Sequence, residues 1–186
     1  MTTLDEKTKE LAAYKGRKAI LLPGNDCMWY PWIAQQLSSI GVPCILTSFP
    51  DSYRARESIW KPFVVDTLGA NEETILVGHS SGAAIIEDTK VFGVVLISSY
   101  TSDLGDANER SSGYFNREWN WEKMKQNAKW VIQYHSRDDH LVPISEGRKV
   151  HENLGTKYYE QEYDGHFQDD EVPGLLEAIQ EKIKTQ

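Results

Sequence analysis

Ser80 lies in a sequence that could make it a nucleophile. It is the central residue of Gly78-His79-Ser80-Ser81-Gly82, a G-x-S-x-G pattern between an apolar run at 74–77 and a helix-compatible run at 83–87. In that context the pattern is typical of a sharp strand-to-helix turn that raises the serine above the edge of a sheet. Glycine is needed on both sides because a Cβ there would strike the neighbouring strand or helix. The alternative, an ordinary glycine-serine turn, is disfavoured by the flanking patterns.

A serine nucleophile needs a base, and the base needs an acid that orients it, because the hydroxyl is weakly nucleophilic at neutral pH. In this class of turn the chain order is serine, acid, histidine. His166 fits as the base, since it follows the last expected strand in Tyr163-Asp164-Gly165-His166-Phe167, where parallel sheets gather functional groups. The other histidines are weaker candidates, because they lie inside the turn, in a charged helix, or without an acid placed upstream: His79, His151, His135 and His140.

The acid should follow the strand before that of the histidine, in the segment 136–143. Asp139 is preferred to Asp138, because the turn that commonly presents the acid counts back from Val142-Pro143. Either aspartate could instead cap a helix or form a turn. A metal site would draw on a cluster that lacks the spacing of a two-histidine helix motif, so we predict no metal and no cofactor: His135, Asp138, Asp139 and His140.

Two backbone donors are needed to stabilise the negative charge that develops on the substrate oxygen. One is expected to be the N–H of Ser81, directly after the serine. The other should come from the loop after the first strand, residues 21–26, where we assign the N–H of Asn25. The alternative for this loop is a strand-ending turn, which Pro23-Gly24-Asn25 would form in any case.

The elements that must position these residues alternate along the chain. Short β-branched runs alternate with segments of helical period, which predicts a mostly parallel sheet of about six strands with helices on both faces. The expected strands are Lys18 to Leu22, Pro43 to Ser48, Glu73 to Val77, Phe92 to Ser98, Trp130 to His135 and Lys157 to Glu162. The expected helices are Trp29 to Ile40, Arg54 to Leu68, Ser81 to Asp88, Trp121 to Asn127, Ser145 to Asn153 and Val172 to Lys184.

Composition bounds the possible partners and the location. At 186 residues the chain is expected to form one domain, 1–186, with a loose tail over residues 1–15. A net charge of -8, from 20 basic and 28 acidic residues, argues against nucleic acid as a partner. No apolar stretch is long enough to span a bilayer and no signal region begins the sequence, so we expect a cytoplasmic protein with no membrane partner. Cys27 and Cys44 are then expected to be free thiols.

The chain resembles the small serine hydrolases related to retinoblastoma-binding protein nine over nearly its whole length. The resemblance is strongest in Tyr100-Thr101-Ser102-Asp103-Leu104-Gly105-Asp106, a run outside the general hydrolase motifs. Other segments support it: residues 22–25, 55–60, 78–82, 108–110, 112–115 and 165–168. The resemblance implies a compact α/β-hydrolase fold without a large lid domain, and a triad at Ser80, Asp139 and His166.

The chain departs from that family at a segment used for partner binding. Animal members carry an L-x-C-x-E segment that binds retinoblastoma-type proteins, whereas this chain has Leu68-Gly69-Ala70-Asn71-Glu72 without the cysteine. We therefore do not expect binding to retinoblastoma-type proteins. The loop after Asn25 is also shorter than in the animal members.

An aromatic-rich segment, residues 114–121, falls between the fourth and fifth expected strands, where larger hydrolases insert a lid. Phe115 and Trp119 are expected to wall a pocket for an apolar or aromatic acyl group. The alternative is that these rings are ordinary core residues. The pocket is favoured because a helix carrying Trp119 and Trp121 two residues apart could not bury both on one face.

The sequence therefore predicts a serine hydrolase that cleaves small esters or amides through an acyl-enzyme. The family resemblance adds aminopeptidase-like cleavage of amides as a candidate. Two alternatives remain: a thioesterase with the same machinery, and a non-enzymatic interaction scaffold on a retained hydrolase fold.

Overall fold

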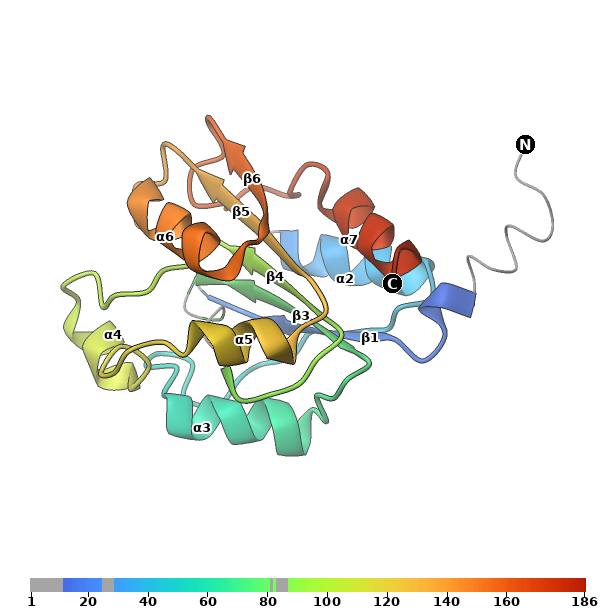
Figure 1. Cartoon of the computed structure of the whole chain (residues 1–186), viewed down its shortest axis with the longest axis horizontal. Helices are drawn as coiled ribbons and strands as arrows, with labels where there is room; N and C mark the ends of the chain where they lie inside the picture. The colour runs from blue at the N-terminus through green and yellow to red at the C-terminus, as the bar shows by residue number, and fades with distance from the viewer. Residues whose placement is uncertain (1–11, 25–28, 81, 83–86) are drawn as a thin grey trace.

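A computed structural model describes residues 12–24, 29–80, 82 and 87–186, which build an open six-stranded sheet between two layers of helices (Figure 1). The strand order is β2-β1-β3-β4-β5-β6, and every neighbouring pair is parallel. The strands are β1 (Lys18–Leu22), β2 (Cys44–Ile45), β3 (Thr74–His79), β4 (Gly93–Ile97), β5 (Val131–Ser136) and β6 (Lys157–Gln161). This confirms the α/β fold expected from the alternating pattern.

The helices cover the two faces of the sheet unequally. In Figure 1, α2 and α7 lie side by side beyond one face, and α3, α5 and α6 lie along the other. Their bounds are α2 (Trp29–Ser39), α3 (Glu57–Pro62) continued by the π-helix η1 (Phe63–Thr67), α4 (Ala107–Ser112), α5 (Trp121–Asn127), α6 (Ile144–Leu154) and α7 (Leu175–Lys184).

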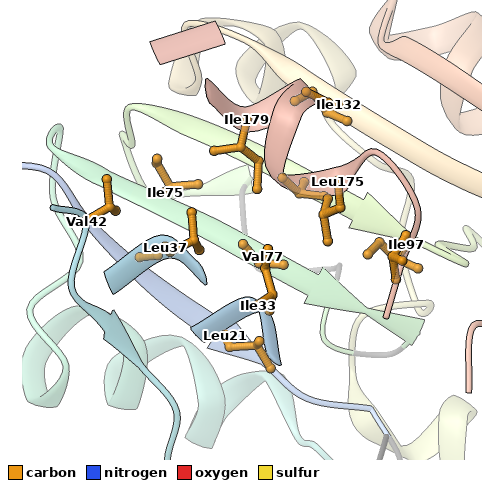
Figure 2. Packing of buried hydrophobic residues seen from close by; sticks show 14 of the residues in the cluster. Leu21, Ile33, Leu37, Val42, Ile75, Val77, Ile97, Ile132, Leu175 and Ile179 are labelled. Atoms are coloured by element: carbon orange, nitrogen blue, oxygen red, sulfur yellow. The ribbon is translucent and has the colours of Figure 1, made fainter. Parts of the chain in front are cut away.

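The two layers are separate apolar clusters because successive side chains of a strand point to opposite faces. On β3, Ile75 and Val77 pack under α2 and α7, whereas Leu76 between them belongs to the other cluster. Figure 2 shows the first cluster, with Leu37 of α2 and Ile179 of α7 among the side chains over the strands. The central strands β3 and β4 are buried along their whole length, which explains their continuous apolar sequence.

The second strand is shorter than expected. The pattern predicted a strand from Pro43 to Ser48, but only Cys44–Ile45 pairs with β1. After this pair the chain leaves the edge of the sheet, and Phe49 packs against Trp60 of α3 with ring centroids 4.6 Å apart. The chain therefore buries the Phe49 ring instead of continuing to pair with β1.

The helix expected over Arg54–Leu68 begins later and is not regular. Ala55 has a positive φ of 48°, so helical geometry starts only at Glu57. Pro62 lacks an N–H to donate inside the helix, and the chain continues from it as a π-helix. One helix, α4, was not predicted at all; its signal is Asp106, whose side chain accepts from the N–H groups of Asn108 and Glu109.

The N-terminal tail expected over residues 1–15 does not extend to Tyr14. Residues 12–14 form a helical turn, and the Tyr14 ring is buried in the cluster under α2 and α7. Burial of an aromatic ring of this size favours ordering of the chain at this position. Most of the helix expected over Ser81–Asp88 lies outside the described residues.

Candidate active site

The candidate site lies at the carboxyl edge of the parallel sheet, where the ends of β1, β3, β4, β5 and β6 meet. Ser80 follows the end of β3 directly and has a positive φ of 54°. A non-glycine residue in this region is strained, as expected for a nucleophile on a sharp turn. A Cβ on Gly82 would lie 2.2 Å from the carbonyl oxygen of Leu22, so this glycine is required by the close approach of β1.

His166 and Asp139 are brought together from two different loops. The Nδ1 atom of His166 lies 2.9 Å from Oδ2 and 3.0 Å from Oδ1 of Asp139, and both side chains are buried. A carboxylate can only accept, so Nδ1 carries the proton and donates a hydrogen bond to Asp139. The Nε2 atom of a neutral His166 is then the basic nitrogen, as general-base chemistry requires.

Asp139 is held in its orientation by three further donors. Its Oδ1 atom accepts from the N–H groups of Leu141 and Val142 at 3.0 and 2.9 Å. Its Oδ2 atom accepts from the hydroxyl of Ser98 at 2.7 Å. Burial would raise the pKa of Asp139, but the hydrogen bonds from His166, Val142 and Ser98 outweigh it and lower the pKa to about 2. The carboxylate is therefore charged at any pH near neutrality.

Asp138 has a different task from its neighbour. Its Oδ1 atom accepts from the hydroxyl of Ser136 and, at 2.9 Å, from the N–H of Gly165. It therefore fastens the loop that carries His166 to the end of β5, while the carboxylate of Asp139 contacts the imidazole. Asp139, the residue preferred by counting back from Val142-Pro143, is thus the aspartate that contacts His166.

Ser98 is a site residue that the sequence did not indicate as one. It follows the end of β4, is fully buried, and has a positive φ of 48°. That backbone conformation directs its hydroxyl to Asp139 across the neighbouring strand. A small polar residue directly after a buried apolar strand of a parallel sheet is the signal that could have found it.

His79 packs behind the candidate site, as its place in the turn suggested. The imidazole is fully buried, and its Nε2 atom donates to the carbonyl oxygen of His166 at 2.9 Å. Its Nδ1 atom lies 2.7 Å from the hydroxyl of Tyr30. Burial, together with the neighbouring His166 imidazole, lowers the pKa of His79 to about 3.

Both residues assigned to the oxyanion hole, Asn25 and Ser81, lie outside the described residues. Gly24, which directly precedes Asn25 in the loop after β1, is described. A Cβ on Gly24 would lie 2.8 Å from the Cβ of Ser80. The end of β1 therefore runs directly beside Ser80, and only glycine fits there without displacing the serine.

Phe115 and Trp119 belong to a group of contacting rings. Phe115 stacks on Tyr100 with centroids 5.3 Å apart and lies 5.9 Å from Trp119, whose Nε1 atom donates to the carbonyl oxygen of Thr101. Trp119 lines a small cavity of about 20 Å³ between α5 and α6, and neither Ser80 nor His166 is among its lining residues.

The prediction that Trp119 and Trp121 could not both pack on one face is wrong. Trp119 precedes the helix α5, whose N-cap is Asn120, so helical spacing does not separate the two rings. Their centroids are 6.1 Å apart, and both pack against the same apolar cluster.

Within residues 12–24, 29–80, 82 and 87–186, no three histidine, cysteine, aspartate or glutamate side chains group as a metal site would require. His135 does lie near the site, with Nε2 3.8 Å from Oδ2 of Asp139, but it donates to the carbonyl oxygen of Val142 instead. No helix in this part of the chain has the length and apolar character needed to cross a membrane.

Known proteins resemble the chain in sequence and in fold. Serine hydrolase RBBP9 of Rattus norvegicus is 42% identical over 177 residues, which cover 89% of this chain and 95% of that protein. The YdeN protein of Bacillus subtilis, whose name describes it as a hydrolase, is 27% identical over 77% of this chain and 80% of its own length. No protein-family model matches.

Solved structures show the same architecture. The YdeN structure superposes with a TM-score of 0.78 at 20% identity, covering 89% of this chain and 97% of that one. The esterase RhEst1 of Rhodococcus superposes with a TM-score of 0.64 at 18% identity, covering 92% of each chain. Given this fold and 42% identity to a serine hydrolase along nearly its full length, the chain belongs to the serine hydrolase family that includes RBBP9.

Proposed function

We propose that the protein hydrolyses small esters or amides through an acyl-enzyme formed on Ser80. His166 removes the serine proton with Nε2 as the serine oxygen bonds to the carbonyl carbon. It then returns that proton to the leaving group as the bond to the leaving group breaks. A water molecule repeats the sequence and releases the acid. Asp139 fixes the imidazole tautomer and stabilises its cation without taking the proton.

The observation that carries this proposal is the bond from His166 Nδ1 to a buried, charged Asp139. A histidine ordered in this way, at the same sheet edge as a strained serine, supplies the groups that nucleophilic catalysis needs. In our proposal the N–H groups of Ser81 and Asn25 stabilise the oxyanion. Phe115 and Trp119 form part of the acyl pocket.

The proposed mechanism suits more than one chemical class of substrate. The esterase named among the structural neighbours supports ester cleavage by the fold. Aminopeptidase-like amide cleavage and thioester cleavage would use the same groups, because each forms the same acyl-enzyme. The rival function is an interaction scaffold without catalytic activity. In that case Ser80, Asp139 and His166 would take part in no reaction.

Labelling with a fluorophosphonate probe tests the nucleophile. We expect the wild-type protein to be labelled on the peptide that contains Ser80, and Ser80→Ala to lose both labelling and hydrolysis of a model ester. The loss in kcat should be on the order of 10⁶-fold, as for removal of other triad serines. Ser111→Ala, at an exposed helix position, is the matched control and should keep both.

Two outcomes would oppose the proposal. Labelling that persists in folded Ser80→Ala would assign the nucleophile elsewhere. An unlabelled and inactive wild-type protein would favour the scaffold. A panel of acetyl, aromatic acyl, aminoacyl amide and thioester donors would then separate the enzyme classes by kcat/KM.

A further inference from the structure

The loop that carries His166 is held through its main chain by side chains of β3 and α2. It lies beyond β6, and Gly165 and Phe167 on either side of the histidine have positive φ angles of 52° and 51°. Its two consecutive carbonyl groups are both occupied: that of His166 accepts from His79, and that of Phe167 accepts from Nε1 of Trp29 at 2.8 Å. Donors from β3 and α2 thus hold a strained loop in place.

The clamp on His166 continues into a chain of hydrogen bonds that ends beside Ser80. The hydroxyl of Tyr30 accepts from the N–H of Gly24 at 2.9 Å and lies 2.7 Å from Nδ1 of His79. Gly24 is also the residue whose absent Cβ makes room for Ser80. One continuous path therefore joins the glycine beside the nucleophile to the backbone of His166.

The direction of every proton along this path follows from its two ends. The N–H of Gly24 can only donate, and the carbonyl of His166 can only accept. His79 must therefore carry its proton on Nε2, and its bare Nδ1 must accept from the hydroxyl of Tyr30. Burial lowers the pKa of His79 to about 3, so the imidazole stays neutral and this arrangement persists at neutral pH.

We propose that His79 and Tyr30 are positioning residues, which hold the His166 imidazole in register with Ser80 by linking the carbonyl of His166 to the N–H of Gly24. This rests on the proposed role of His166 as the base. The rings of His79 and His166 also contact directly, with centroids 4.8 Å apart, so a displaced His79 would move the base by two routes.

The expected consequence is a selective loss of turnover. A shift of the base by about 1 Å can cost on the order of 100-fold in rate, while the binding of the ground-state substrate changes little. His79→Leu removes the hydrogen bonds to His166 and Tyr30 and should lower kcat roughly 10- to 100-fold with a nearly unchanged KM. His79→Gln can present a donor near the position of Nε2 and should recover most of that loss. Tyr30→Phe removes one hydroxyl and should fall between the two.

The proton on His166 Nδ1 gives a readout that does not depend on activity. Its proton NMR resonance reports the hydrogen bond to Asp139. We expect this resonance to shift or broaden in His79→Leu and to return toward its wild-type position in His79→Gln. Ile179→Val, a buried change in α7, is the control for stability alone. It should lower the melting temperature and leave both the resonance and kcat unchanged.

The outcomes separate this inference from the proposed function. An unchanged resonance and unchanged kcat in folded His79→Leu, or in Tyr30→Phe if the first variant fails to fold, would overturn the positioning role. The same holds if His79→Gln is as damaged as His79→Leu. Failure of the probe to label the wild-type protein would instead overturn the catalytic proposal, and the resonance would still test the clamp.

Discussion

Two regions near the carboxyl edge of the sheet are held in opposite ways. The acid–base corner, which comprises Ser98 and the loops 136–142 and 163–167, is fixed by hydrogen bonds between buried polar groups. The aromatic segment, residues 114–121, is fixed by ring contacts within one apolar cluster and by ion pairs nearer the surface. Specific hydrogen bonds therefore hold the first region, and contacts shared among several aromatic rings hold the second.

This difference predicts how each region responds to substitution. In the acid–base corner each donor has a particular acceptor, so a change of one atom leaves a buried group unpaired, at the full cost of its desolvation. In the aromatic segment several rings share each contact, so one truncation removes part of a surface. Effects should therefore be steep and specific in the corner, and graded in the aromatic segment.

The largest difference in kcat is expected between substitutions of the two adjacent aspartates. Asp139→Asn would present an amide to Nδ1 of His166 and favour the wrong imidazole tautomer, which costs on the order of 10⁴ in kcat in the best-studied triad. Asp138→Asn keeps an oxygen that can accept from Gly165, so its loss should be far smaller. Steady-state assays of a model ester, with thermal melts to confirm folding, measure both variants.

A reversed ranking would assign the orienting role to Asp138. Equal losses in the two variants would mean that the corner acts as one hydrogen-bonded unit, in which the loop anchor matters as much as the carboxylate that contacts the imidazole.

The strands and the polar residues at their ends could be predicted from sequence. Parallel pairing brings all carboxyl ends to one edge, so topology alone predicts that Ser80, Asp139 and His166 lie at the same edge of the sheet. The bounds of β1 and α5 agree with the pattern at both ends, because apolar runs and a capping asparagine mark them. These are local signals, and local chemistry decides them.

The rest depended on contacts between distant parts of the chain. The sequence places Ser98 and Asp139 41 residues apart, and only the register of β4 and β5 brings them together. The clamp from Trp29 to Phe167 spans 138 residues. The shortened β2 likewise follows from burial of Phe49 on Trp60, which no pattern within the strand could reveal.

A second prediction compares Phe115 and Trp119 as pocket residues or core residues. If they wall the acyl site, truncation of either to alanine should lower kcat/KM for a bulky acyl group roughly 10- to 200-fold relative to acetyl. If they are core residues, the variants should melt at lower temperature and lose activity on every substrate together. The ratio of the two rates, set beside the melting temperature, decides between the roles.

Phe63→Ala is the matched control for loss of an aromatic ring on the same face. Phe63 begins η1, and its ring meets that of Phe49 edge to face with centroids 5.1 Å apart, outside the aromatic segment. Its acyl preference should remain that of the wild-type protein. An unchanged preference in Trp119→Ala and Phe115→Ala as well would remove both from the pocket.

A third prediction concerns acid and separates the two regions by pH. The pKa of His79 is lowered to about 3, and burial also lowers the pKa of His135, so these two imidazoles bind fewer protons in the folded state than in the unfolded chain. Stability rises with pH wherever the unfolded state binds more protons, so the free energy of unfolding should fall as the pH drops from 7 to 5. The guanidinium of Arg117 keeps its charge over this range.

Urea unfolding at several pH values measures that slope. His79→Gln should make the slope shallower without abolishing it, because His135 remains. An identical slope in His79→Gln would mean that His79 binds protons equally in the folded and unfolded states, and would contradict the lowered pKa.

The smallest effect is expected where ion pairs hold the aromatic segment. Arg117 donates to Oε1 of Glu57 at 2.8 Å and pairs with Glu87, whose side chain is 8% exposed. Arg117→Met keeps much of the aliphatic stem but leaves Glu87 without this cation, which should cost about 1–3 kcal/mol of unfolding free energy. Lys125→Met breaks an exposed pair with Glu122 and should change stability by less than about 0.5 kcal/mol.

Equal values for the two variants in urea unfolding would show that the pair with Glu87 contributes no more than a surface pair. A loss confined to Arg117→Met, with an unchanged dependence on denaturant, would show that one partly buried cation fastens the segment to α3. If that variant also shifts the acyl preference toward smaller groups, the segment must be both anchored and part of the pocket, because a merely structural loss would lower all rates together.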